Sequence, residues 1–242
     1  MQLARSVIFL AQMYFIMALM AIFFVPWAMV DRRGAFAAVR TYTQWVRWTA
    51  HWIVGLQSEI RGQIPTGNVI IAAKHQSFFD VILITSVLSH PRFIMKSELR
   101  WVPFVGYYAK RIGCIAIDRN KGFASVKHML KALSYGDTKQ TPNDQKSIGQ
   151  VVIYPQGTRL APGVMKSYGV GVAALYAQMN LNCVPTATNV GYFWPRRGIL
   201  RKSGLAVVEF LPVIPKGLPK KDFMATVEAR IECASDGLLR KT

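Results

Sequence analysis

The sequence is poor in acidic residues and in cysteine. It has 12 aspartates and glutamates against 30 lysines and arginines, which gives a formal net charge of +18. Its three cysteines, Cys114, Cys183 and Cys233, are odd in number and far apart, so they suggest neither a disulfide framework nor a zinc-binding pattern. We therefore expect the protein to work in a reducing compartment.

Motifs of several common enzyme classes are also missing. The chain has no Gly-x-Ser-x-Gly sequence, which argues against an α/β-hydrolase, and no Walker A sequence. Residues 169–174 match a variant of the dinucleotide-binding fingerprint, but no strand is expected before them and no acidic residue follows at the required spacing. Close helix packing is the simpler interpretation of these glycines.

The positive charge is combined with an apolar composition, since 52% of the residues are hydrophobic. A nucleic-acid-binding module would explain the charge but not this hydrophobicity, so we expect no nucleic-acid partner. A chain that is both basic and apolar fits a protein held at an anionic membrane surface.

One long stretch, residues 6–30, has no charged residue. As a helix it would be about 37 Å long at ~1.5 Å per residue, enough to cross a bilayer with tilt, although a pair of helices that enters one leaflet fits as well. It is too long for a secretory signal peptide. One arginine precedes it and four follow by residue 47, so the positive-inside rule places the rest of the chain on the cytoplasmic side of the inner membrane.

Residues 42–60 carry three tryptophans, Trp45, Trp48 and Trp52, among apolar and polar residues. This pattern predicts an amphipathic helix. An aromatic face at the membrane interface and an ordinary core-facing helix are both consistent with it.

Beyond residue 60, short apolar runs alternate with helical patterns. We predict strands at residues 69–73, 93–95, 114–117, 150–154, 183–188 and 205–210. Helices are expected at residues 81–88, 103–112, 123–133, 170–179 and 221–232, and a polar loop at residues 137–149. This alternation predicts an α/β domain with a mixed central sheet flanked by helices.

His75 and Asp80 directly follow the first of these strands in a His-x-x-x-x-Asp arrangement. On one helix they would point about 140° apart, but they can meet if His75 ends the strand and Asp80 lies in the first turn of the next helix. An imidazole oriented by a carboxylate is a general base for a hydroxyl group. The segment from Ser77 to Asp80 also resembles a capping box, and the two roles are compatible.

Two more charged turns are expected at strand ends. Arg119 follows residues 114–117, and Gly157-Thr158-Arg159 follows residues 150–154. A guanidinium group binds phosphate oxygens in a bidentate manner, although either turn alone would fit a solvated arginine. Ligand sites of open α/β sheets cluster outside the carboxyl ends of strands, so we expect His75, Arg119 and Arg159 to share one site.

The order of these motifs resembles that of the glycerolipid acyltransferases, and in particular their bacterial lysophosphatidic acid acyltransferase members. The resemblance rests on four blocks, at residues 75–80, 113–119, 154–159 and 184–185, with further similarity at residues 96–103 and 193–197. It runs from about residue 67 to about residue 215. The resemblance implies that the chain divides into membrane-anchoring helices over residues 1–60 and a catalytic acyltransferase domain over residues 61–242.

The resemblance implies transfer of a fatty acyl group from acyl-carrier protein or acyl-coenzyme A to the sn-2 hydroxyl of 1-acyl-glycerol-3-phosphate. The product would be phosphatidic acid, made at a membrane for phospholipid synthesis. His75 would be the general base, oriented by Asp80, with no acyl-enzyme intermediate. Pro185 would shape the acyl or acceptor pocket. Neither a metal nor a cofactor beyond the thioester co-substrate is implied.

The same resemblance implies substrate-binding roles for five residues. Arg119 and Arg159 would hold the acceptor phosphate, and Lys96 is a further candidate. Gly157 and Thr158 would shape their loop, and they are candidates for donors near the developing oxyanion.

Gln156 departs from the pattern, because the family usually has glutamate at this position. Glutamine keeps a carbonyl acceptor but loses the charge. The change is either without effect or the sign of another acceptor, such as a lyso-ornithine lipid. A catalytically silent lipid-binding or carrier-binding protein is a third alternative, against which the intact pair His75 and Asp80 argues.

Overall fold

The computed structural model describes residues 1–118, 121–134 and 148–242. Within that part of the chain the helices are α1 (Gln2–Val30), α2 (Arg32–Thr49), α3 (Phe78–Val87), α4 (Val105–Arg111), α5 (Phe123–Ser134), α6 (Gly171–Met179), α7 (Val190–Phe193) and α8 (Lys220–Arg240), with a π-helical turn η1 (Ala50–Val54) and a 3-10 turn η2 (Ser97–Trp101). The strands are β1 (Leu56–Arg61), β2 (Val69–Ala73), β3 (Pro91–Lys96), β4 (Ile115–Ile117), β5 (Gln150–Ile153), β6 (Cys183–Thr188) and β7 (Gly204–Phe210).

The strands form one sheet in the order β1-β7-β6-β2-β5-β3-β4. Every neighbouring pair is parallel except β6 and β7, which are antiparallel. The predicted mixed central sheet is therefore confirmed. The strand that precedes His75, β2, lies in the middle of this sheet between β5 and β6.

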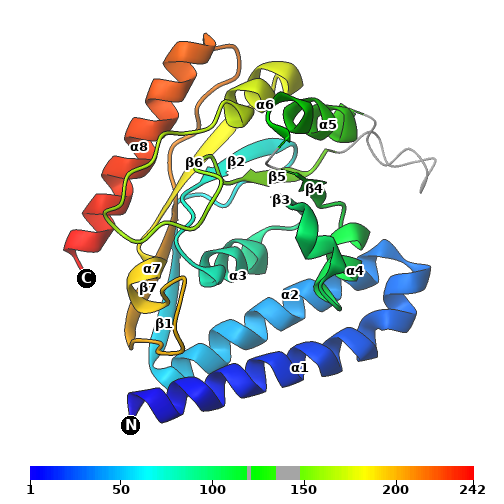
Figure 1. Cartoon of the computed structure of the whole chain (residues 1–242), viewed down its shortest axis with the longest axis vertical. Helices are drawn as coiled ribbons and strands as arrows, with labels where there is room; N and C mark the ends of the chain where they lie inside the picture. The colour runs from blue at the N-terminus through cyan, green and yellow to red at the C-terminus, as the bar shows by residue number, and fades with distance from the viewer. Residues whose placement is uncertain (119–120, 135–147) are drawn as a thin grey trace.

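Helices cover both faces of the sheet, as Figure 1 shows, with α5, α6 and α8 on one side and α1, α2 and α3 on the other. β2 is buried along its whole length because its side chains serve both layers. Val69, Ile71 and Ala73 pack with α3, whereas Ile70 and Ala72 pack with α6 and α8. A continuous apolar run is what a strand buried on both faces requires.

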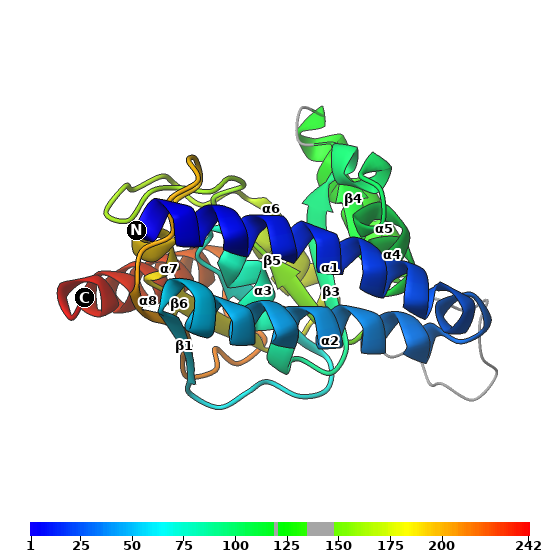
Figure 2. The ribbon, with the colours of Figure 1, turned by 90° about the horizontal axis from the view of Figure 1, so that it is seen from below.

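Helices α1 and α2 form a hairpin that lies along one end of the molecule, with its two arms side by side (Figures 1 and 2). Asp31 joins the arms, and its carboxylate accepts a hydrogen bond from the Arg33 amide at 2.8 Å, which caps α2. Phe9 of α1 is fully buried against the ring of Trp194, with ring centroids 5.4 Å apart. The hairpin is thus packed onto the α/β domain.

The outer side of α1 remains apolar and exposed. Its exposed large apolar residues are Leu3, Val7, Ile8, Tyr14, Phe15, Leu19, Ile22, Phe23, Trp27, Met29 and Val30. By length and composition alone, α1 is long and apolar enough to cross a membrane.

The predicted helix over residues 42–60 is helical as far as Val54 and is wrong over residues 56–60. α2 ends at Thr49, the π-helical turn ends at Val54 and is capped by Gly55 with φ +73°, and Leu56 begins the edge strand β1, which pairs with β7. A glycine in the left-handed region commonly ends a helix, and here the chain enters a strand directly after it. The predicted boundary between residues 60 and 61 lies inside this strand.

The other predicted strands and helices are confirmed, with small shifts of their ends. The largest shift concerns α8, which continues to Arg240 rather than ending at residue 232. The predicted loop over residues 137–149 lies outside the described residues, except for its last two positions.

Candidate active site

His75 and Asp80 meet as predicted. His75 follows the end of β2, and Asp80 lies in the first turn of α3. The Nδ1 atom of His75 lies 3.0 Å from Oδ1 and 3.2 Å from Oδ2 of Asp80. Asp80 is fully buried, while the His75 side chain remains 14% exposed. A half-buried imidazole is therefore held by an interior carboxylate.

The same carboxylate caps α3. Its Oδ2 atom accepts hydrogen bonds from the backbone amides of Gln76 and Ser77, both at 2.8 Å. Ser77 completes the capping box, because its hydroxyl accepts a bond from the Phe79 amide at 3.1 Å. The cap that the sequence suggested for Asp80 is thus present, and it fixes the carboxylate against His75.

Tyr154, at the end of β5, is a further partner of this pair. Its ring stacks on the His75 ring, and its hydroxyl donates to Asp80 Oδ1 at 3.2 Å. Burial and the nearby Asp80 charge raise the pKa of Tyr154 well above 10, so its hydroxyl stays protonated as a donor. In the sequence, Tyr154 stands out only as a polar ring inside the third block, which does not predict this role.

The bond to Asp80 decides how His75 carries its proton. Because Asp80 accepts a bond from Nδ1, the neutral ring has its hydrogen on Nδ1 and a lone pair on Nε2. Among residues 1–118, 121–134 and 148–242, Nε2 of His75 has no hydrogen-bond partner. It can therefore accept a proton from the hydroxyl group of a ligand.

The turn after β5 carries the predicted Gly157-Thr158-Arg159 segment. Gly157 adopts φ +69°, and its amide donates to the Tyr154 carbonyl at 2.9 Å, which closes the turn. A glycine suits this position because the left-handed region is strained for other residues. The amide of Leu160, three residues further on, donates to the His75 carbonyl at 2.9 Å. The turn is therefore tied directly to His75.

Arg159 is half-buried in this turn. Within the described part of the chain its guanidinium has no carboxylate partner. A second cation lies close, because the Arg196 guanidinium donates to the Arg159 carbonyl at 3.3 Å. This corner of the site is positively charged and suits an anionic group.

The remaining predicted site residues are Lys96, Pro185 and Arg119, and no contact with His75 or Asp80 is described for them. Lys96 ends β3 at the same sheet edge, and its ammonium lies 2.6 Å from Glu98 Oε1. This hydrogen bond lowers the pKa of Glu98 to about 2. Pro185 is buried inside β6, in register with Ala72 of β2. Arg119 lies outside the described residues.

Gln156 points into the interior and is 3% exposed. Its Nε2 atom donates to Glu232 Oε1 at 3.2 Å and to the Lys166 carbonyl at 3.4 Å. Its Oε1 atom is buried, with no partner among the residues that the structure describes. The sequence analysis missed Glu232, which lies at the position where it expected the last helix to end.

Comparisons with known proteins show the family of this chain. A family model described as Acyltransferase matches residues 56–189. A 1-acyl-sn-glycerol-3-phosphate acyltransferase of Pseudomonas aeruginosa is 28% identical over 218 residues, which cover 88% of this chain and 81% of that protein. The Escherichia coli protein of the same name is 27% identical over 181 residues, which cover 70% of this chain and 67% of that protein.

A solved structure has the same fold. The 1-acyl-sn-glycerophosphate acyltransferase PlsC of Thermotoga maritima matches with a TM-score of 0.78 over 98% of both chains, at 18% sequence identity.

The family match extends over more than half of the chain. It begins at β1, ends just after β6, and includes His75, Asp80 and Arg159. The chain belongs to the acyltransferase family and is an enzyme of that family.

Proposed function

We propose that this enzyme transfers a fatty acyl group from a thioester to the sn-2 hydroxyl of 1-acyl-glycerol-3-phosphate, and so forms phosphatidic acid. The observation that carries the proposal is the pair of His75 and Asp80, 3.0 Å apart, tied by backbone to the turn with Arg159. This acceptor requires a base that takes the proton of its hydroxyl group and, close by, a cation that binds its phosphate. The names of the Pseudomonas and Escherichia coli relatives support the same reaction.

In this mechanism His75 activates the acceptor. The acceptor hydroxyl donates its proton to Nε2 of His75 while its oxygen attacks the thioester carbonyl carbon. Asp80 stabilises the imidazolium that forms. The tetrahedral intermediate then breaks its carbon–sulfur bond, and the proton passes from His75 to the departing thiolate. The acyl group moves directly from sulfur to oxygen, without a covalent acyl-enzyme.

The oxyanion of this intermediate needs donors near the Gly157 turn. The Gly157 amide already donates to the Tyr154 carbonyl, so we assign it a shaping role rather than a donor role. The amide and hydroxyl of Thr158, the next residue, are the better candidates for the oxyanion. Donors held in place before the reaction are effective because they do not have to reorganise.

Arg159 is the main candidate for binding the acceptor phosphate. Its half-buried guanidinium offers a fixed charge and a bidentate geometry. Lys96 is a weaker candidate, because a phosphate would compete with the Glu98 carboxylate for its ammonium. Arg119 retains its predicted role as a second phosphate ligand. Pro185, buried in β6, would affect the pocket through the path of its strand.

The acyl donor would be acyl-carrier protein or a coenzyme A thioester, as the co-substrate. The proposed reaction involves no further cofactor. The formal charge of +18 favours either donor, because carrier proteins are acidic and coenzyme A carries phosphates.

We also propose that α1 lies in one leaflet rather than crossing the membrane. Both of its ends contact the same domain: Gln2 donates to the Arg201 carbonyl at 2.7 Å, and Arg111 donates to the Met29 carbonyl at 3.5 Å. A helix tied to one domain at both ends is suited to lie along the surface, with its exposed apolar side in the lipid. The predicted location, the cytoplasmic side of the inner membrane, remains part of the proposal.

The burial of Gln156 bears on the alternative acceptors. A lyso-ornithine lipid is the alternative acceptor, because glutamine stands at position 156 in place of the usual glutamate. The Gln156 amide binds Glu232 in the interior, so the substitution has an internal explanation that does not involve the substrate. We therefore favour lysophosphatidic acid as the acceptor.

The test is acyl transfer by the purified protein in mixed micelles. Lysophosphatidic acid and lyso-ornithine lipid would be compared as acceptors, each with acyl-carrier-protein and coenzyme A thioesters. We expect phosphatidic acid from the wild type and from His128→Ala, an exposed histidine of α5, but at least about 100-fold less from His75→Ala. Equal activity of the His75 variant would remove the base from the mechanism, and transfer only to the lyso-ornithine lipid would refute the acceptor.

A further inference from the structure

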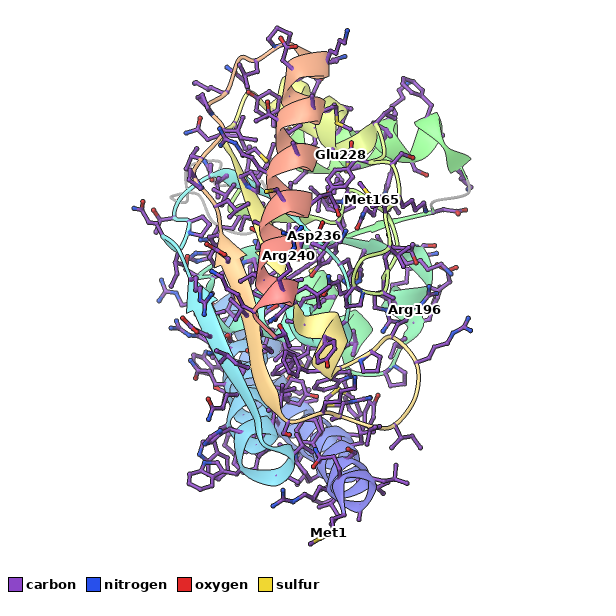
Figure 3. The ribbon with its side chains drawn as sticks, turned by 90° about the vertical axis from the view of Figure 1, so that its left-hand side faces the viewer. Met1, Met165, Arg196, Glu228, Asp236 and Arg240 are labelled. Atoms are coloured by element: carbon purple, nitrogen blue, oxygen red, sulfur yellow. The ribbon has the colours of Figure 1, made fainter. Side chains whose placement is uncertain are left out.

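Glu232 is a buried carboxylate shared by three segments of the active-site region. It lies on α8, one turn from Glu228 and one turn from Asp236, which Figure 3 labels on either side of it along the helix. The Lys74 ammonium binds its Oε2 atom. Its Oε1 atom accepts hydrogen bonds from the Gln156 amide at 3.2 Å and from the Tyr168 hydroxyl at 2.8 Å.

In this cluster of Lys74, Gln156, Tyr168 and Glu232, the two charged groups are paired with each other. Lys74 is 3% exposed, and the Glu232 side chain is 12% exposed, so neither charge is well solvated. In the described ranges, Glu232 is the only carboxylate that forms an ion pair with Lys74. Removing one partner of such a pair leaves an uncompensated charge in the interior, which is far more damaging than removing both.

The partners of Glu232 lie next to the residues of the proposed mechanism. Lys74 directly precedes His75, and its own amide donates to the Thr186 carbonyl of β6 at 2.9 Å. Gln156 lies in the turn that presents Thr158 and Arg159. A single side chain, 158 residues from Lys74 in the sequence, therefore ties the end of β2 to the turn after β5.

The orientation of Gln156 follows from the same carboxylate. Its amide group donates to Glu232, and its own carbonyl oxygen is left without a partner among the described residues. A carboxylate at position 156 would instead face Glu232 with like charge, which is unfavourable at this distance. The amide at position 156 and the carboxylate at position 232 are thus complementary.

We propose that Glu232 is a positioning residue that holds the proposed base, His75, in place relative to Arg159, and that it supplies from α8 the carboxylate that the resemblance places at position 156. The proposal rests on the proposed function. It predicts that the two side chains are exchangeable as a pair but not singly, because the exchange keeps one carboxylate and one amide in contact with each other in the cluster that contains Lys74.

The experiment compares Glu232→Gln, Gln156→Glu and the double variant Q156E/E232Q, with Asp236→Asn as the matched control one turn along α8. We expect kcat to fall at least about tenfold in each single variant, with a smaller change in KM for lysophosphatidic acid. The double variant should recover to within about threefold of wild type, and the control should stay within about twofold. If Glu232→Gln does not fold, the double variant and Gln156→Glu decide the question.

A second measurement does not depend on the substrate. Diethylpyrocarbonate modifies accessible neutral imidazoles, and the rate at His75 can be followed by mass spectrometry of its peptide. We expect Glu232→Gln to change this rate at least about threefold, and the double variant to restore it. Single variants that behave like wild type in both assays, or a double variant no better than the worse single one, overturn the proposal. If the wild-type enzyme is inactive on lysophosphatidic acid, the proposed function is overturned instead. The modification rates of His75 then still test whether Glu232 positions this residue.

Discussion

The ring of Tyr154 stacks on the ring of His75, with centroids 3.9 Å apart and planes inclined by 17°. Both side chains also bond to the same oxygen of Asp80, His75 at 3.0 Å and Tyr154 at 3.2 Å. Tyr154 thus restrains the His75 imidazole by stacking on its face, and it restrains the Asp80 carboxylate through the hydrogen bond of its hydroxyl.

The two contributions of Tyr154 can be separated by mutation. Tyr154→Phe keeps the stacked ring and removes the donor to Asp80, and a hydrogen bond to a charged group is worth about 1.5–3 kcal/mol. We expect kcat/KM to fall about tenfold in this variant and about 100-fold in Tyr154→Leu, which loses the ring as well. Tyr107→Phe, a half-exposed tyrosine of α4, is the control. Equal losses in both Tyr154 variants would contradict a role for the stacking.

Asp80→Asn should inactivate the enzyme while preserving the fold. The backbone amides of Gln76 and Ser77 require an acceptor, so the asparagine carbonyl would turn toward them and its amide toward His75. His75 would then accept at Nδ1 and carry its proton on Nε2, which is the wrong tautomer for a base.

We expect this Asp80 variant to lower kcat about 10³-fold or more, with a thermal midpoint within a few degrees of wild type, as measured by kinetics and by circular dichroism. Asp80→Ala, which also loses the cap of α3, should be less stable as well as inactive. Substantial activity of Asp80→Asn would show that the tautomer of His75 does not matter.

Arg159→Lys tests recognition of the acceptor phosphate. Lysine retains the charge but loses the planar, bidentate guanidinium, so the change should affect binding more than chemistry. We expect KM for lysophosphatidic acid to rise about tenfold with a smaller change in kcat. Arg240→Lys, an exposed arginine of α8 labelled in Figure 3, should match wild type. An unchanged KM would transfer the phosphate-binding role to other cations.

Local sequence signals were sufficient for some features and insufficient for others. The meeting of His75 and Asp80 was predictable, because a strand end and a helix cap lie within a few residues of each other. The edge strand β1 was not, because residues 57–59 are all polar and lack the alternation of a half-buried strand, and they come directly after an amphipathic helix. The contact of Lys74 with Glu232 joins residues 158 positions apart and depends on how α8 packs over the sheet.

Two phenylalanines of α1 form a matched pair for testing membrane attachment. Phe9 is fully buried against the domain, whereas Phe23 is 79% exposed. Phe23→Ser should weaken binding to anionic vesicles about tenfold without unfolding the protein, since burying such a side chain contributes about 1.5–3 kcal/mol. Phe9→Ser should instead lower the thermal midpoint.

The net charge of +18 predicts that vesicle binding also falls as salt is raised, which sedimentation with phosphatidylglycerol vesicles would measure. Binding that does not change with salt would leave apolar insertion alone responsible. If Phe23→Ser has no effect on binding, α1 does not present this side to the lipid.

Alkaline pH should destabilise the protein through Cys183. Burial raises the pKa of this thiol from 9.0 to about 12. Between these values the unfolded thiol loses its proton while the folded one keeps it, so the free energy of unfolding falls as pH rises, by at most about 1.4 kcal/mol per pH unit for one such group. Cys114, whose pKa burial raises to about 11, adds a second contribution.

Denaturant unfolding at intervals between about pH 8 and pH 10.5 measures this slope. Cys183→Ala should make this slope shallower without abolishing it, because Cys114 and buried tyrosines such as Tyr154 still contribute, whereas Cys233→Ala should leave it unchanged, because Cys233 is exposed. The alanine at position 183 also creates a small cavity, which shifts the whole curve downward but does not depend on pH. The slope, not the absolute stability, is therefore the quantity that isolates the buried thiol, and equal slopes for the two variants would contradict the assignment.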